Sequence, residues 1–307
     1  RTLLPRPSGV VLSARGSSAA AATIGRHALA LATARPAMVE PLSLAGYGWA
    51  PDFHGWLHVA ASQSGRTPEI VSAAAEHAAA GACTIGVTND PCSPLAAVVD
   101  LVLDLDAGPE LAVPATKTVV AQIVALLHVA AAYDDSFAFD DATWTRFTDS
   151  MRACLDDDAA ISPVCAASSS AATLIVTGRG YGFAAAREGA LKIKEASCLP
   201  AEAVSHTELL HGPIAVAGPA TPVIVVRIAG PAAASADRLI IELRRRAVPH
   251  WILGDGADAD LAVPPGLPEP LSTVLAVIRM QQLARALAEV RGIDADQPNE
   301  LSKVTYT

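Results

Sequence analysis

The sequence predicts an α/β protein made of two similar halves, each with a five-stranded parallel sheet covered by helices. Short apolar runs rich in Val, Ile and Leu alternate with longer helical segments. Such alternation is typical of parallel strands that are buried on both faces. The alternation stops once near the middle of the chain and then restarts. At 307 residues the chain is long enough for two ordinary domains.

Residues 1–155 are expected to form the first domain. Its expected strands are 9–13, 37–40, 56–60, 83–88 and 98–103. Helices are expected after Arg15 through Ala34 and over 68–76, 116–133 and 143–154. The second helix is expected to begin near Pro68, because proline is favoured in the first turn of a helix.

The second domain is expected over residues 156–292, with 156–170 acting as a linker. Its expected strands are 173–177, 201–204, 222–226, 250–253 and 259–263. Helices are expected over 188–195 and 271–291, and a polar tail spans 293–307. Two similar α/β halves in tandem suggest a duplication, with a ligand site between the halves.

The composition excludes several classes of protein. The chain is 51% hydrophobic and 17% charged, as in globular proteins. Its net charge of −9 argues against nucleic acid as a partner, and the run Arg244-Arg245-Arg246 is expected to be a solvated helix face. No apolar run has membrane-spanning length and no signal-peptide core is present, so we expect a cytoplasmic protein without membrane contact. Since the numbering starts at Arg1 without Met, we expect further residues upstream.

The five cysteines give no sign of disulfides or of a metal site. They are odd in number, scattered and without metal-ligand spacing: Cys83, Cys92, Cys154, Cys165 and Cys198. We expect them to be buried thiols of a reducing compartment, and we expect no metal.

A polar loop between a predicted strand and a predicted helix is the first candidate site. The loop is Ser62-Gln63-Ser64-Gly65-Arg66-Thr67. Amide groups at a helix start lack internal partners, and the helix dipole favours negative charge there. The hydroxyls of Ser62, Ser64 and Thr67 and the amide of Gln63 add donors, and Gly65 permits a close approach. The loop is either an anion site or an ordinary capped turn.

Further polar side chains gather in the second half. Lys192 and Glu195 are three residues apart on one predicted helix, so they share a face. His211 precedes Gly212-Pro213 and is expected in a fixed turn. Each of these features also has an ordinary structural explanation: a solvated ion pair or a turn histidine bonded to backbone. A single lysine, Lys303, lies near the chain end, where such residues are normally exposed and inert.

Six motifs in order nevertheless resemble the double sugar-isomerase (SIS) domain family. They are Gly16-Ser17-Ser18, Ser62 to Thr67, Ala115-Thr116-Lys117, Glu188 to Glu195, His211-Gly212-Pro213 and Asp296-Gln297-Pro298 with Lys303. The resemblance covers nearly the whole chain and includes the isomerase half of glutamine–fructose-6-phosphate aminotransferase. It implies two flavodoxin-like units.

The resemblance also implies roles for individual residues. The phosphate-binding residues are expected to be Ser62, Gln63, Ser64 and Thr67, and the sugar-contacting ones Gly16, Ser17, Ser18, Val113 and Ser302. Glu195 corresponds to the acid/base glutamate, Lys192 to the helix lysine and His211 to the ring-opening histidine. Lys303 corresponds to the Schiff-base lysine. No cofactor is implied, and a homodimer whose site is completed across the interface is expected.

Three departures from the family pattern affect the expected function. Ala115 stands where the family has a sugar-contacting serine, and Ser302 stands where it has alanine. No glutamine-hydrolysing domain is present in this sequence. We therefore expect a deaminase that converts glucosamine 6-phosphate to fructose 6-phosphate and ammonia. Deglycation of an amine-linked fructose 6-phosphate, simple aldose–ketose isomerisation and a non-enzymatic sugar-phosphate-binding regulator are the alternatives.

Overall fold

The computed structural model describes residues 6–49 and 51–298, which divide into two compact units. The first unit holds residues 6–111 and 115–139, and the second holds 112–114 and 140–298. Helix α5 (Asp141–Asp156) falls in the second unit, where it packs against α10 (Glu269–Val290). The domain boundary expected from the sequence, at residue 155, differs from this division in residues 112–114 and 140–155.

The first unit contains a five-stranded parallel sheet in the order β2-β1-β3-β4-β5. The strands are β1 (Val10–Ala14), β2 (Ala37–Val39), β3 (Leu57–Ala61), β4 (Cys83–Thr88) and β5 (Leu101–Asp104). All residues of the neighbouring strands β1 and β3 are buried. The continuous apolar runs thus belong to central strands with both faces covered, as expected.

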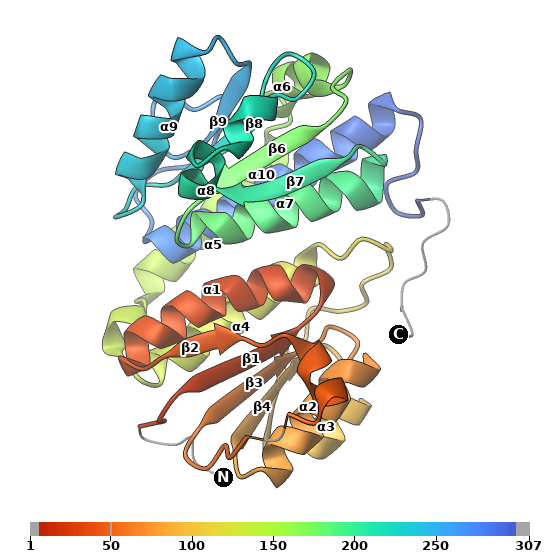
Figure 1. Ribbon diagram of the computed structural model, residues 1–307, viewed down its shortest axis with the longest axis vertical. Coiled ribbons are helices and arrows are strands. Elements are labelled where there is room, and N and C mark those ends of the chain that lie inside the picture. The colour runs from red at the N-terminus through yellow and green to blue at the C-terminus, as the bar shows by residue number, and fades with distance from the viewer. Residues whose placement is uncertain (1–5, 50, 299–307) are drawn as a thin grey trace. The chain divides into compact units, whose positions relative to one another are not determined.

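Helices cover both faces of this sheet (Figure 1). One face is covered by α1 (Gly16–Thr33) and α4 (Lys117–Ala131), and the other by α2 (Pro68–Ala79), α3 (Pro94–Val98) and the short η1 (Leu42–Tyr47). A short η2 (Asp135–Phe137) follows α4. The small residues of α1 allow close packing: a side chain on Gly25 would lie 2.9 Å from Leu126 of α4.

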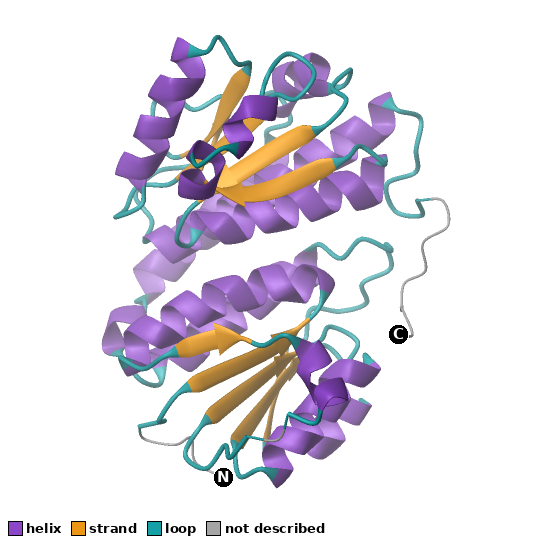
Figure 2. Cartoon of the chain, in the orientation of Figure 1, coloured by secondary structure: helices purple, strands orange, loops and turns teal. Residues whose placement is uncertain are grey.

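The second unit repeats the arrangement, with a parallel sheet in the order β10-β9-β8-β6-β7. Its strands are β6 (Leu174–Gly178), β7 (Ala201–Ser205), β8 (Val223–Arg227), β9 (His250–Gly254) and β10 (Leu261–Ala262). Read from β7, both sheets have the flavodoxin-like order 2-1-3-4-5. Figure 2 shows both sheets between layers of helices, which confirms the predicted fold class.

The helices of the second unit also lie on both faces of its sheet. One face carries α7 (Gly182–Ser197) and α10, with α5 and α6 (Ile161–Ser168) packed on α10. The other face carries α9 (Ala233–Arg245), beside α8 (His206–Leu210) and η3 (Pro213–Val216). Gly189 brings α7 close to α10, since a side chain there would lie 2.5 Å from Met280.

Several local expectations were wrong. Residues 156–170 are not an irregular linker, because α6 forms there with Ile161, Val164 and Cys165 buried. The predicted strand 98–103 begins at Leu101, since Val98 ends α3.

All five cysteines are free thiols, as expected, but Cys92 and Cys198 are exposed rather than buried. The described part of the chain has no helix with the length and apolar character needed to cross a membrane.

Candidate active site

Two of the motif loops follow adjacent central strands of the first sheet. After β1 the chain enters α1 on one face, and after β3 it enters α2 on the other. In an open α/β sheet, a crevice forms at this switch point beyond the carboxyl ends of the two strands. The loops are linked by an ion pair of 2.8 Å between Arg15 Nε and Glu69 Oε2. The fold therefore brings Gly16-Ser17-Ser18 near the 62–67 loop.

Backbone bonds hold the 62–67 loop in one conformation. The carbonyl of Gln63 accepts from the Asn89 amide at 2.9 Å, and the carbonyl of Gly65 accepts from the Leu95 amide at 3.0 Å. Gly65 has a φ of +61°, and a Cβ there would lie 2.1 Å from Ser93 Oγ. Only glycine fits this position without strain. The loop is thus preorganised by contacts with the segment after β4.

The hydroxyl groups of this region are not used to cap their own helices. Thr67 is the N-cap of α2 but makes no side-chain capping bond, and its Oγ1 lies 3.3 Å from Ser62 Oγ. The Ser64 hydroxyl accepts from the Arg66 amide at 3.2 Å. At the start of α1, Ser17 is partly exposed, and the helix again has no side-chain cap. Two helix starts with adjacent hydroxyls can hold a dianion such as a phosphate group.

The start of α4 is already occupied by a carboxylate. Glu110 accepts hydrogen bonds from the amides of Thr116 and Thr118 at 3.3 and 3.0 Å. Ala115 has only a methyl group, so it adds no hydroxyl beside these two amides. Val113, a predicted sugar contact, donates its amide to the Asp296 carbonyl at 2.8 Å. The donor groups of this segment are therefore engaged within the protein. Glu110 was not predicted as a site residue, because no motif in the sequence marks it.

Helix α7 carries a lysine between two carboxylates. Lys192 is buried and forms an ion pair with Glu195, three residues on, while its Nζ lies 3.7 Å from Glu188 Oε1. The Glu188 side chain is 0% exposed and that of Glu195 is 28% exposed. Glu188 was not predicted as a site residue, although its i,i+4 spacing from Lys192 was visible in the sequence. The trio can supply a general base beside a fixed positive charge.

The remaining predicted residues are His211, Ser302 and Lys303. His211 is exposed at the C-cap of α8, and its backbone amide donates to Thr207 and Glu208. Ser302 and Lys303 lie outside the described residues. The structure thus assembles two groups, one in each unit: the hydroxyl-rich loop after β3, and Lys192 with its carboxylates on α7.

Comparison with known proteins relates both groups to one family. The sequence profile of the SIS domain matches residues 4–132 and 169–262. Glutamine–fructose-6-phosphate aminotransferase [isomerizing] from Leifsonia xyli subsp. xyli is 33% identical over 316 residues, covering 96% of this chain and 51% of that protein. The chain therefore spans about half the length of such relatives.

Solved structures agree with this assignment. A protein of Silicibacter pomeroyi provisionally named a phosphosugar isomerase matches with a TM-score of 0.85 and 30% identity, over 94% of this chain and 89% of that one. Glucosamine-6-phosphate deaminase from Thermotoga maritima shares the fold, with a TM-score of 0.79 and 23% identity over 98% of this chain and 92% of that one. The resemblance seen in the motifs is thereby confirmed: this chain belongs to the SIS domain family.

Proposed function

We propose that the chain is a sugar-phosphate isomerase acting on an amino-sugar 6-phosphate. In the proposed reaction, glucosamine 6-phosphate and water give fructose 6-phosphate and ammonia. The observation that carries the proposal is the position of Lys192, buried between Glu188 and Glu195 on α7. A module that only binds a phosphorylated ligand needs the loop after β3, whereas a proton-transfer enzyme also needs a base and a group that stabilises negative charge.

The 62–67 loop and the start of α2 are proposed to hold the phosphate group. The Ser62 and Thr67 hydroxyls lie within 3.3 Å of each other, so both can point at one anion. The loop is braced by the Gln63 and Gly65 carbonyls, which accept bonds from the next segment. Binding a dianion there requires little further ordering of the loop, and this anchors one end of the sugar.

Glu195 is proposed to move the proton between C2 and C1 of the opened sugar. Its carboxylate is partly exposed, whereas that of Glu188 is fully buried, so substrate can reach only Glu195 of the two. Removing the C2 proton places negative charge on the C1 oxygen, which the Lys192 ammonium can stabilise. Return of the proton to C1 leaves an imine at C2, and its hydrolysis releases ammonia.

His211 is proposed to open the sugar ring by moving a proton between the ring oxygen and the C1 hydroxyl. Its exposure in a turn at the end of α8 suits a side chain that completes the site of a second subunit in a homodimer. Lys303 is proposed to form an imine with the ketose. We expect the enzyme to work in the cytoplasm without a cofactor.

The test is an assay of ammonia release and of ketose formation on a panel of amino-sugar and neutral sugar 6-phosphates. We expect release from glucosamine 6-phosphate that is lost in Glu195→Gln and kept in Glu289→Gln, an exposed glutamate on α10 that pairs with Arg285. Ketose formation from neutral aldoses without ammonia release would favour simple isomerisation. Cleavage of an amine-linked fructose 6-phosphate would favour a deglycase, and tight binding without turnover a regulator.

A further inference from the structure

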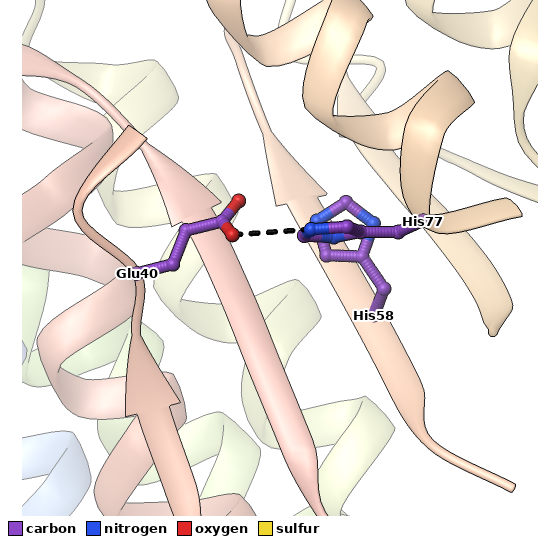
Figure 3. Close-up of side chains that lie close together, drawn as sticks. All are labelled: Glu40, His58 and His77. Atoms are coloured by element: carbon purple, nitrogen blue, oxygen red, sulfur yellow. Dashed lines mark ion pairs between the residues drawn. The ribbon is translucent and has the colours of Figure 1, made fainter. Parts of the chain in front are cut away.

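Three side chains that the proposed reaction does not use gather beneath α2 in the first unit. Glu40 follows β2, His58 lies on β3 and His77 lies in the last turn of α2 (Figure 3). Their exposed fractions are 7%, 0% and 5%, and one donor atom of each lies within 4.8 Å of the others. Burying three such groups together is costly unless a charge or a ligand compensates.

We propose that Glu40, His58 and His77 bind a divalent first-row transition metal ion, with Zn²⁺ the best fit. His77 Nε2 and Glu40 Oε2 lie 3.2 Å apart. Two ligand atoms of a tetrahedral zinc ion, each about 2.0–2.1 Å from the metal, lie about 3.3 Å apart. Two imidazoles and one carboxylate are also a donor set that zinc takes up in proteins.

The hydrogen bonds around Ser13 indicate which form His58 takes. The Ser13 hydroxyl donates its one hydrogen to Glu40, so its 2.6 Å contact with His58 Nε2 is made by the imidazole donating. Because Nε2 carries the hydrogen, Nδ1 is the nitrogen of His58 that can offer a lone pair to a metal ion.

The protein alone leaves this cluster unsatisfied. Nδ1 of His58 and Nδ1 of His77 are buried without a hydrogen-bond partner among the described residues. A purely structural network would be expected to pair these nitrogens, because an unpaired buried polar atom costs about 1–3 kcal/mol. A metal ion bound at Nδ1 of His58 satisfies the first of these nitrogens, whereas His77 would bind through Nε2, the atom that faces Glu40.

A pocket of about 510 Å³ gives access to the cluster from outside. Glu40 and His77 line it together with apolar side chains, among them Leu42, Trp49 and Phe53. The Phe53 ring lies 4.3 Å from the His77 ring, centroid to centroid. Three protein ligands leave one position of a tetrahedral zinc ion open, and the pocket can supply water or a small ligand there. The proposed site is thus a metal at the base of an apolar pocket, formed by residues other than those of the phosphate loop.

The test measures metal binding rather than turnover, so it does not depend on the proposed reaction. The full chain is freed of metal with a chelator, and binding of Zn²⁺ is followed by calorimetry and by metal analysis after dialysis. We expect one retained Zn²⁺ per chain, and affinity reduced at least about 100-fold in Glu40→Gln and His77→Gln, since even loss of outer partners costs 10–100-fold. His54→Gln is the control, because His54 is an exposed histidine paired with Asp52 in the same unit.

Each result decides the proposal. Failure to retain Zn²⁺, unchanged affinity in Glu40→Gln, or loss of binding in His54→Gln would overturn it. Should a variant fail to fold, Co²⁺ added to the unaltered chain replaces it as the deciding measurement. We expect the strong visible absorption of four-coordinate Co²⁺, removed by added Zn²⁺. A weak six-coordinate spectrum, as for Co²⁺ in water, would contradict the buried site.

Discussion

Lys192 and Glu195 form an ion pair across one turn of α7, and their side chains differ in exposure, at 3% and 28%. The ammonium is thus held inside the unit while part of the carboxylate faces outward. Glu188, fully buried on the other side of Lys192, adds a second negative charge at 3.7 Å. A lysine fixed in this way cannot swing out to solvent, so its charge stays beside the partly exposed carboxylate of Glu195.

Glu195→Gln is expected to abolish proton exchange at C2, whereas His211→Ala is expected to keep it. Glutamine preserves the shape of the side chain but cannot accept the proton, and loss of a general base typically lowers the rate about 10²–10⁴-fold. The measurement is incorporation of solvent deuterium at C2 of an open-chain substrate analogue, which bypasses ring opening. Exchange lost in His211→Ala and kept in Glu195→Gln would mean that the two roles are reversed.

Thr67→Val is expected to weaken substrate binding more than it slows turnover. The change removes one hydroxyl that lies 3.3 Å from Ser62 Oγ, and one hydrogen bond to an anion contributes about 1–2 kcal/mol, so KM should rise about 5–30-fold. Ser72→Ala, an exposed serine on the same helix, should change nothing. A sulfate or phosphate bound at another loop in a crystal would contradict the assignment.

Gly65→Ala is expected to destabilise the first unit and to impair phosphate binding. The residue has a φ of +61°, and the added Cβ would meet Ser93 Oγ at 2.1 Å. The left-handed conformation alone costs an alanine about 1–2 kcal/mol, and the collision adds to this. Gly266→Ala is the matched control, since its φ is +88° with no atom within 4 Å. Equal losses of unfolding free energy in urea would show that the collision has no effect.

Removal of the residues after Gln297 is expected to abolish turnover and to leave both sheets folded. Asp296, whose carbonyl accepts from the Val113 amide at 2.8 Å, is retained in this truncation. Lys303→Ala in the full chain should reproduce the loss, because the proposed imine needs the amine of that lysine. Circular dichroism checks the fold. A truncated chain with full activity would exclude Lys303 from the reaction.

His206 is expected to make the protein less stable as the pH falls from 6.5 to about 4. Burial lowers the pKa of His206 from 6.5 to about 4, and its Nδ1 lies 2.9 Å from Ser235 Oγ. In that pH range the unfolded chain binds a proton at His206 that the folded chain does not bind, so the free energy of unfolding rises with pH. The shift corresponds to about 3 kcal/mol, fully lost near pH 4. Urea unfolding at pH 7 and at pH 4.5 should show a smaller difference for His206→Gln than for the unaltered chain, and an equal difference would contradict the assignment.

Much of the fold could be predicted from the sequence because its signals are local. The apolar runs at 10–14, 57–61 and 223–227 remove their side chains from water when they form strands buried on both faces. The helices between these strands allow the strands to pair in parallel. The loop from Ser62 to Thr67 was recognisable for the same reason, since strand, turn residues and helix start are contiguous. One local element was missed. Helix α6 lies in a stretch whose polar and small residues resemble those of a linker.

The sequence by itself determined the fold class, the order of the motifs and the pairing of Lys192 with Glu195, which depends only on helical spacing. Only the tertiary structure decided which side chains are in contact and which are buried. Glu110 accepts hydrogen bonds at the start of α4, and Glu195 is partly exposed whereas Glu188 is buried. Glu40, His58 and His77 come together from a loop, a strand and a helix. The cluster of Glu40, His58 and His77 joins three separate elements, and it follows from strand order and the packing of α2 on the sheet, which no local pattern encodes.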